Sequence, residues 1–195
     1  SDPGDDITRY VWDFGDGSMP ASGSDLDEVT HTYPDDGVYF LQLTVEDRDG
    51  GVASHRWPVV VANVSPMLTV AGNESSAEGA EYSLLLGTLH DPGNDTVAAY
   101  MVHWGDGTTD TYDAAGVVHH VYRDGPAQHT IRVSVRDEDG IHPELAAVTV
   151  GIDNRAPVIN ALGGATSGRE GERVKLTADV TDPAGPADLL VFTWD

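Results

Sequence analysis

The stretch YVWDFGDGS (Tyr10 to Ser18) combines aromatic residues, aspartates and glycines in one short segment, and YMVHWGDGT (Tyr100 to Thr108) does the same about ninety residues later. Before the first glycine of each stretch, every second residue is large and apolar, which is the spacing of one face of a β-strand. Gly-Asp-Gly then predicts a tight turn that ends the strand. The chain therefore contains the same strand and turn twice, and we expect Trp12 and Phe14 to be core residues, because large aromatic side chains on one face of a strand indicate a core.

Four further landmarks recur in the same order and at nearly the same spacing, which indicates an internal repeat. They are HTY (31–33) with HVY (120–122), TVEDRDG (44–50) with SVRDEDG (134–140), NVSP (63–66) with NRAP (154–157), and DPGDD (2–6) with DPGND (91–95) and DPAGPAD (182–188). A period of about 90 residues is too long for a solenoid repeat and is typical of a small β-sandwich domain.

The local patterns within a repeat are those of strands. Residues alternate between two faces over 38–45 and again over 131–136, which is the period of a strand. Gly, Pro, Asp and Asn separate such runs, and no segment predicts a helix. For the middle repeat we expect strands near 67–71, 81–90, 98–104, 117–122, 129–136 and 145–152.

The predicted fold class is all-β, with tandem Ig-like β-sandwich domains joined by short linkers. The landmarks divide the chain into residues 1–64, a repeat that lacks strands A and B, residues 65–155, a complete repeat, and residues 156–195, which start a third repeat with strands A to C. Two incomplete sandwiches cannot bury their apolar faces alone. We therefore expect 156–180 of one molecule to complete the 1–64 sandwich of the next, or neighbouring residues of a longer array to supply the missing strands.

Charge and composition exclude several classes of function. The formal net charge is -23, and Lys175 is the only lysine, so the chain should repel nucleic acid and anionic membranes and attract cations. There is no cysteine, so neither a disulfide framework nor a thiolate metal site is available. No apolar run is long enough for membrane insertion as a helix.

The ordered motifs W-D-F-G-D-G, H-T-Y, G-x-Y and L-T-V-x-D-x-D-G (12–50) resemble the polycystic-kidney-disease (PKD) repeat. The second copy departs from the pattern with VHWGDG (102–107) and with GPAQH (125–129) in place of G-x-Y. The resemblance implies Ig-like sandwiches in extracellular or cell-surface proteins, where they act as spacers, adhesion modules or accessory domains of secreted hydrolases. It implies no catalysis, so the chain is expected not to be an enzyme.

The aspartates of the two Gly-Asp-Gly turns, Asp16 and Asp106, are expected to accept hydrogen bonds from backbone N–H groups of the turn. The alternative is that they belong to a ligand site. His31 and His120 fall in the pattern of an expected strand and predict structural positions rather than metal ligands.

Acidic loops predict calcium sites. In this topology the B–C and F–G loops lie at one pole of each sandwich, beside the incoming linker, and oxygen ligands of this kind suit Ca²⁺. DNRAP (153–157) also resembles the calcium-binding linkers of cadherin-like domains. The alternative is that these residues are solvated turn aspartates. The candidate metal ligands are Asn63, Asp91, Asp95, Asp137 and Asp139 for the middle repeat, Asp2, Asp6, Asp47 and Asp49 for the first, and Asp153, Asn154, Asp182 and Asp188 for the third.

Three N-x-[ST] motifs, at Asn63, Asn73 and Asn94, are candidate glycosylation sites in predicted loops. A glycan on Asn63 or Asn94 would compete with calcium binding there, because a glycosylated amide is a poor ligand.

Two functions follow. The first is a non-enzymatic extracellular structural or adhesion array, stiffened by calcium and assembling head to tail into a filament with neighbouring repeats or copies of itself as partners. The second is an accessory module of a secreted hydrolase that binds extracellular polysaccharide or a collagen-like protein. The second would need an exposed aromatic platform, for which Trp57 and Tyr112 are the candidates.

Overall fold

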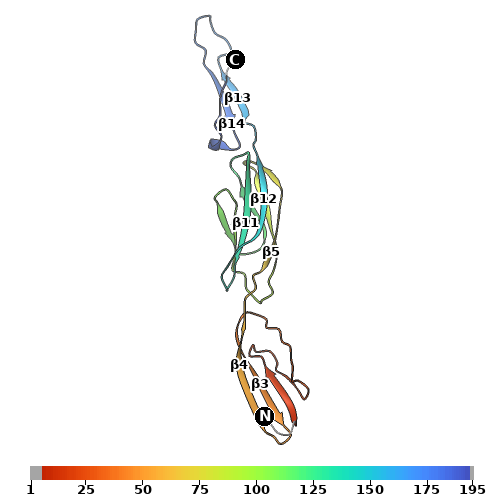
Figure 1. Ribbon diagram of the computed structural model, residues 1–195. Helices are drawn as coiled ribbons and strands as arrows, with labels where there is room; N and C mark the ends of the chain where they lie inside the picture. Colours follow the sequence, from red (N-terminus) through yellow and green to blue (C-terminus); the bar gives the residue numbers. More distant parts are fainter. Residues whose placement is uncertain (1–5, 194–195) are drawn as a thin grey trace. The chain divides into compact units, whose positions relative to one another are not determined.

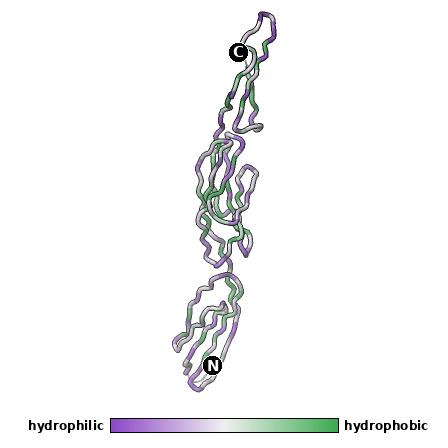
Figure 2. The backbone as a smooth tube through the Cα atoms, turned by 180° about the vertical axis from the view of Figure 1, so that it is seen from behind, coloured by the Kyte–Doolittle hydropathy of each residue, from purple (hydrophilic) through white to green (hydrophobic). Residues whose placement is uncertain are grey.

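A computed structural model describes residues 6–193 and is all-β, as predicted (Figure 1). The chain forms two compact units, one of residues 6–66 with 91–96 and the other of residues 67–90 with 97–193. Hydrophobic and hydrophilic residues alternate along the strands of both units, as Figure 2 shows.

The first unit contains one antiparallel sheet. Its strands are β1 (Ile7–Asp13), β2 (Ala21–Gly23), β3 (Gly37–Asp47) and β4 (Val52–Val61), in the order β2-β1-β3-β4. The register places Trp12 opposite Leu43 and Tyr10 opposite Val45. Because directly opposed residues point to the same face, one face of this sheet is apolar and aromatic.

Only part of that face is buried. Phe14 is 6% exposed, as predicted, whereas Trp12 is only half-buried. The prediction that Trp12 is a core residue is therefore wrong for the first unit as described. The reason is that no second sheet of the described residues covers it.

The second unit contains a complete sandwich. One sheet has the order β10-β7-β5 and the other β6-β12-β11-β8-β9. The strands are β5 (Met67–Gly72), β6 (Ser75–Ala77), β7 (Glu81–His90), β8 (Ala99–His103), β9 (Thr109–Tyr112), β10 (Gly116–Val121), β11 (Ala127–Arg136) and β12 (Ile141–Asp153). All six strands expected for the middle repeat are present. The sequence did not predict β6, a short strand that pairs in parallel with β12.

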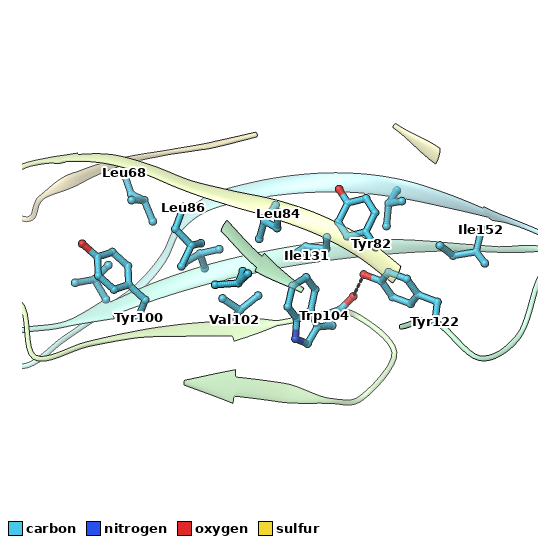
Figure 3. Close-up of a cluster of buried hydrophobic side chains, with 14 residues drawn as sticks. Leu68, Tyr82, Leu84, Leu86, Tyr100, Val102, Trp104, Tyr122, Ile131 and Ile152 are labelled. Atoms are coloured by element: carbon cyan, nitrogen blue, oxygen red, sulfur yellow. Dashed lines mark hydrogen bonds between the residues drawn. The ribbon is translucent and has the colours of Figure 1, made fainter. Parts of the chain in front are cut away.

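The core of the sandwich is the set of alternating side chains that the two sheets turn toward each other (Figure 3). Trp104, Ile131 and Val133 at its centre have no exposed surface. The Tyr122 hydroxyl donates a hydrogen bond of 2.9 Å to the carbonyl of Trp104, so the polar end of a buried ring is satisfied. This hydrogen bond joins the core to the Gly-Asp-Gly turn at Trp104, the residue that directly follows β8.

The Gly-Asp-Gly turns need glycine at their first position. Gly105 has a φ of 86°, and a Cβ added there would lie 2.7 Å from the carbonyl oxygen of Thr130. Gly15 of the first unit has a φ of 77° and would clash in the same way with Phe40. Both the left-handed backbone and the close neighbouring strand exclude a side chain.

Past the sandwich, the second unit continues into a hairpin. It consists of β13 (Val158–Gly164) and β14 (Leu176–Thr181), which pair only with each other within the described chain, followed by a short 3-10 helix, Gly185–Ala187. Residues 188–193 form no strand.

Candidate metal centres

Three carboxyl groups converge in the first unit. The side chains of Asp35 and Asp91 interact with the carboxyl group of Asp95, and we call these three residues the first acidic cluster. Burial, together with the two neighbouring carboxyls, raises the pKa of Asp95 to about 7. The Asp95 carboxyl is therefore largely protonated below neutral pH, because its surroundings disfavour the ionised form.

The first acidic cluster borders a small cavity of about 100 Å³. Its lining includes Asp35, Asn63 and Asp95 together with residues 92–93. Three residues that the sequence suggested as ligands, Asn63, Asp91 and Asp95, thus belong to one unit and one neighbourhood. Asp35 was not among the predicted ligands.

A second set of carboxyls converges in the second unit. One oxygen each from Glu78, Asp182 and Asp188 lies within 4.8 Å of the others, and we call these three the second acidic cluster. Asp182 and Asp188 are half-buried, whereas Glu78 has no exposed surface. Burial, and then the charges of Glu78, Asp182 and Asp124, raise the pKa of Asp188.

Backbone N–H groups hold Glu78 in place. Its two carboxylate oxygens accept hydrogen bonds from Gly125 N (2.8 Å) and Arg155 N (2.7 Å). The side-chain amide of Asn154 lies 3.2 Å from Glu78 Oε1 and from Asp188 Oδ2, and donates to both when its nitrogen faces them. A buried carboxylate is thus fixed at the point where three distant segments meet.

The two acidic clusters occupy equivalent places in the repeat. Asp35 and Asp124 follow the Tyr of HTY and HVY at the same spacing, and Asp91 and Asp182 begin the two Asp-Pro loops. In the first unit Asp35 and Asp91 contribute to the raised pKa of Asp95. In the second unit Asp124 and Asp182 contribute in the same way to the raised pKa of Asp188. The acidic clusters are therefore a feature of the repeat rather than of one loop.

The aspartates of the hairpins between β3 and β4 and between β11 and β12 have turn partners. Asp137 Oδ1 accepts from Asp139 N and Gly140 N, and Asp137 Oδ2 lies 2.6 Å from His142 Nε2. In the first unit Asp47 Oδ1 accepts from Asp49 N and Gly51 N in the same way.

The remaining suggested ligands belong to neither acidic cluster, and one of them lies outside the described residues. Asp153 is exposed, and its carbonyl accepts from Glu78 N. Asp6 accepts from Arg48 N through its carbonyl. Asp2 lies outside the described residues. Asn63, Asn73 and Asn94, the candidate glycosylation sites, are all exposed.

Each Gly-Asp-Gly aspartate pairs with a histidine that sequence reasoning did not connect to it. Asp16 Oδ1 accepts from Ser18 N and Asp106 Oδ1 from Thr108 N, both at 2.9 Å. Their second oxygens bind His31 Nε2 and His120 Nε2. Although burial opposes it, the hydrogen bonds from Thr108 and His120 lower the pKa of Asp106 to about 2. The recurrence of His at nearly the same offset from Gly-Asp-Gly was the available signal.

The two candidates for an exposed aromatic platform, Trp57 and Tyr112, are both half-buried. Trp57 lies on the apolar face of the first unit, edge-on to Trp12 with ring centroids 6.2 Å apart. Tyr112 packs against the core of the second unit. Both rings therefore contribute to packing within their own units. Within residues 6–193 we also find no helix with the length and apolarity needed to span a bilayer.

Comparison with known proteins supports the sequence motifs. Residues 1–61 match the family model described as PKD domain. Collagenase ColA of Clostridium perfringens (strain 13 / Type A) is 36% identical over 70 residues, which is 36% of this chain and 6% of that protein. A microbial collagenase of Vibrio alginolyticus is 37% identical over 62 residues, 32% of this chain and 7% of that protein.

The chain thus matches only a small part of the length of these curated relatives. Among solved structures, fibronectin(III)-like modules of Clostridium thermocellum CbhA align over 78% of this chain and 80% of theirs, with 17% sequence identity and a TM-score of 0.36. The resemblance to the PKD repeat is confirmed for residues 1–61.

Proposed function

Because residues 1–61 carry a PKD domain match, we propose that this chain is a non-catalytic extracellular module, an array of PKD-like sandwiches that binds Ca²⁺ at its two acidic clusters. In this role the sandwiches set a length, and copies of the chain join head to tail. The observation that carries the proposal is the convergence of carboxyls at equivalent places in successive repeats.

The chemistry of the acidic clusters favours a hard divalent cation. Burial, and after it the neighbouring carboxyl groups, raise the pKa values of Asp95 and Asp188, because burial and like charges both disfavour the ionised form. A cation would remove the repulsion and restore the ionised carboxylates. Carboxylate and amide oxygens without sulfur or imidazole suit Ca²⁺ better than a transition metal.

In the second acidic cluster each residue has a distinct part. Glu78 is buried and fixed by two backbone donors, so it would contribute a preorganised ligand. Asp182 Oδ1 accepts from Ala184 N, whereas its buried Oδ2 has no hydrogen-bond partner and is available to a cation. A rotation of the Asn154 amide would present its oxygen in place of its nitrogen. Calcium would therefore tie the β13–β14 hairpin to the sandwich that precedes it.

The experiment is a calcium titration of the chain by isothermal calorimetry, with melting followed in parallel. Binding to the folded state alone raises stability by about 2.7 kcal/mol at a hundredfold excess over Kd. We expect Asp182→Asn to abolish one binding event. The matched control is Asp179→Asn, an exposed aspartate of β14, which should bind as the parent does.

Sodium chloride at equal ionic strength separates binding from screening. A melting temperature that rises equally in NaCl and in CaCl2, with no heat of binding, would contradict calcium binding and reduce the effect to general screening of a chain with a net charge of -23.

A second function is favoured by the two collagenase relatives. It is an accessory module that binds a collagen-like protein or a polysaccharide beside a catalytic domain. The exposed aromatic surface that such a module needs is offered by Phe40, which is 47% exposed and stacks under the Arg56 guanidinium at 4.4 Å. Val38 and Val60 extend this patch on the same face of β3 and β4.

Cosedimentation with insoluble collagen and with polysaccharide tests this second function. Binding should fall in Phe40→Ala and persist in Val117→Ala, a control at an exposed position of β10. Equal binding by both variants would show that the Phe40 patch is not the binding surface.

A further inference from the structure

A column of four rings lies beside the Gly-Asp-Gly turn of each unit. The centroids of neighbouring rings in both columns are between 3.8 and 4.9 Å apart. The rings are, in order, those of Phe14, His31, Tyr33 and Tyr39 in the first unit and of Trp104, His120, Tyr122 and His129 in the second. The last ring therefore differs in kind, because the second unit has an imidazole where the first has a phenol.

The two last rings make different contacts. The Tyr39 hydroxyl donates to the carbonyls of Asp35 and Asp36, at 2.9 and 3.2 Å, and so binds the loop that precedes β3. The His129 ring binds the Gly-Asp-Gly turn instead, where its Nδ1 lies 3.2 Å from the carbonyl oxygen of Gly105. Because a carbonyl only accepts, Nδ1 carries the proton of this bond, and Nε2 of the neutral ring is left as an acceptor.

The second unit has a cavity beside His129. Its volume is about 660 Å³, within the range of about 300–1,000 Å³ that is typical of small-molecule sites. An imidazole is smaller than a phenol, and this one binds the turn rather than the loop before β11. The space between the ring column and that loop therefore stays open. The lining includes Asp106, His120, Arg123, Asp124 and His129.

Hydrogen-bonding groups of both kinds line the cavity. The Asp106 oxygens are already taken, since Oδ1 accepts from Thr108 N and Oδ2 binds His120. Arg123 and Asp124 are exposed neighbours in the loop, and they supply a guanidinium donor and a carboxylate acceptor. The half-buried His129 ring adds the acceptor Nε2. One strong donor and two acceptors thus line the same hollow surface.

These groups exclude several classes of ligand. An apolar ligand would leave the charges of Arg123 and Asp124 without water or a partner. The side chains of the cavity are not among the groups of three converging metal-ligand atoms in the described part of the chain, so a single metal ion does not fit. A chain with a net charge of -23 repels an anionic polymer. A neutral ligand with adjacent donors and acceptors remains, and the vicinal hydroxyls of a sugar have this property because each hydroxyl both donates and accepts.

We infer that this cavity binds one neutral hexose residue of a polysaccharide. One sugar hydroxyl donates to the Asp124 carboxylate, its neighbour accepts from the Arg123 guanidinium, and a third donates to His129 Nε2. The departure of GPAQH (125–129) from the repeat pattern thereby has a function, because it opens the cavity. The site belongs to the second unit and uses neither the acidic clusters nor the Phe40 patch, so it goes beyond both proposed functions.

An NMR titration of the whole 15N-labelled chain tests the inference. The probes are soluble hexasaccharides of glucose, of mannose and of galactose at neutral pH. At least one of them should shift the amide signals of Gly105, Asp124 and His129 in a saturable way. The dipeptide Gly-Gly and a polygalacturonate fragment are the zwitterionic and anionic comparison ligands, and neither should produce these shifts.

The variant His129→Tyr restores the residue of the first unit and should fill the cavity. Because the first unit accommodates tyrosine at this place in its ring column, the variant should fold, which urea unfolding checks. We expect its dissociation constant for the hexasaccharide to rise at least about 10-fold. The matched control is His103→Tyr, at an exposed histidine of β8, which should bind as the parent does.

The variant Arg123→Gln removes the donor at an exposed position that is not part of the ring column. Its dissociation constant should also rise about 10-fold, because one charged hydrogen bond to the sugar is lost. Arg136→Gln removes the same charge from an exposed position at the end of β11 and should leave the affinity unchanged.

Equal affinity in His129→Tyr and in the parent would overturn the inference, since the sugar would not occupy the space that a phenol fills. Shifts produced by Gly-Gly and by none of the sugars would also overturn it and assign the cavity to a peptide terminus, and so would the absence of shifts with every probe. Phe40→Ala should retain the sugar binding, and His129→Tyr should bind calcium as the parent does. Failure of either proposed function is therefore distinguishable from failure of this site.

Discussion

Asp106 Oδ2 lies 2.7 Å from His120 Nε2, and the same pair recurs in the first unit between Asp16 Oδ2 and His31 Nε2 at the same distance. In each unit the histidine ring also stacks on the aromatic residue that directly follows the strand, Trp104 after β8 or Phe14 after β1. In each unit the Gly-Asp-Gly turn is therefore attached to the segment that carries the histidine. The aspartate has two tasks, one in its own turn and one in this attachment.

We expect Asp106→Ala to destabilise the second unit by about 1–2 kcal/mol, because Thr108 N and His120 both lose their acceptor. The measurement is urea unfolding at neutral pH. Asp113→Ala, at an exposed position, is the control and should change little. If the two variants unfold alike, the attachment contributes nothing to stability.

Trp104→Ala should be much more damaging than Trp12→Ala. Trp104 has no exposed surface and its Nε1 donates to Asp110, so truncation should cost about 3–5 kcal/mol. Trp12 is half-buried on an uncovered face, and its truncation should cost about 1–3 kcal/mol in the monomer. The comparison requires unfolding at a concentration below that of any self-association. Equal losses would mean that the face of the first unit is covered.

The stability of the first unit should fall as the pH rises from about 4 to about 7 in EDTA. The pKa of Asp95 is raised from 3.8 to about 7, so over this window the folded state retains a proton that the unfolded chain has released. The effect is therefore present at low pH and is lost as the pH passes the folded pKa. Asp95→Asn should flatten this slope, whereas Asp25→Asn, at an exposed position, should preserve it.

Glu78→Ala should destabilise the second unit even without calcium. It would leave the N–H groups of Gly125 and Arg155 without their acceptor, a cost of about 2–4 kcal/mol. Glu78→Gln retains one carbonyl oxygen and should recover part of this loss. Thermal unfolding in EDTA measures both variants. A harmless Glu78→Ala would show that the residue matters only as a cation ligand.

The strands of the middle repeat could be predicted because their information is local. Alternation in 131–136 and the turn residues around it define β11 without reference to any distant residue. The repeat then made each pattern visible twice. The half-burial of Trp12 could not be predicted from the same alternation, since it depends on whether a second sheet is present.

The acidic clusters were only partly predictable. Asp91, Asp95, Asp182 and Asp188 belong to loops that the repeat placed at one pole, so their selection followed from topology. Glu78 was missed because nothing in SSAEGAEY (75–82) marks it as buried. Its environment is created by Gly125 and Arg155, which are far away in sequence, and such a contact has no periodic pattern.

The parallel pairing of β6 with β12 has a mechanical consequence. Ser75–Ala77 lies near the start of the second sandwich and Gly151–Asp153 at its end, and the two run side by side in the same direction. Tension applied at the two ends of the sandwich would slide these strands past each other, so that their hydrogen bonds are loaded together in shear. Antiparallel strands pulled from one end would instead unzip one bond at a time. The short strand β6, one of two strands of this sandwich that the sequence did not predict, is therefore placed to resist a pull along the chain.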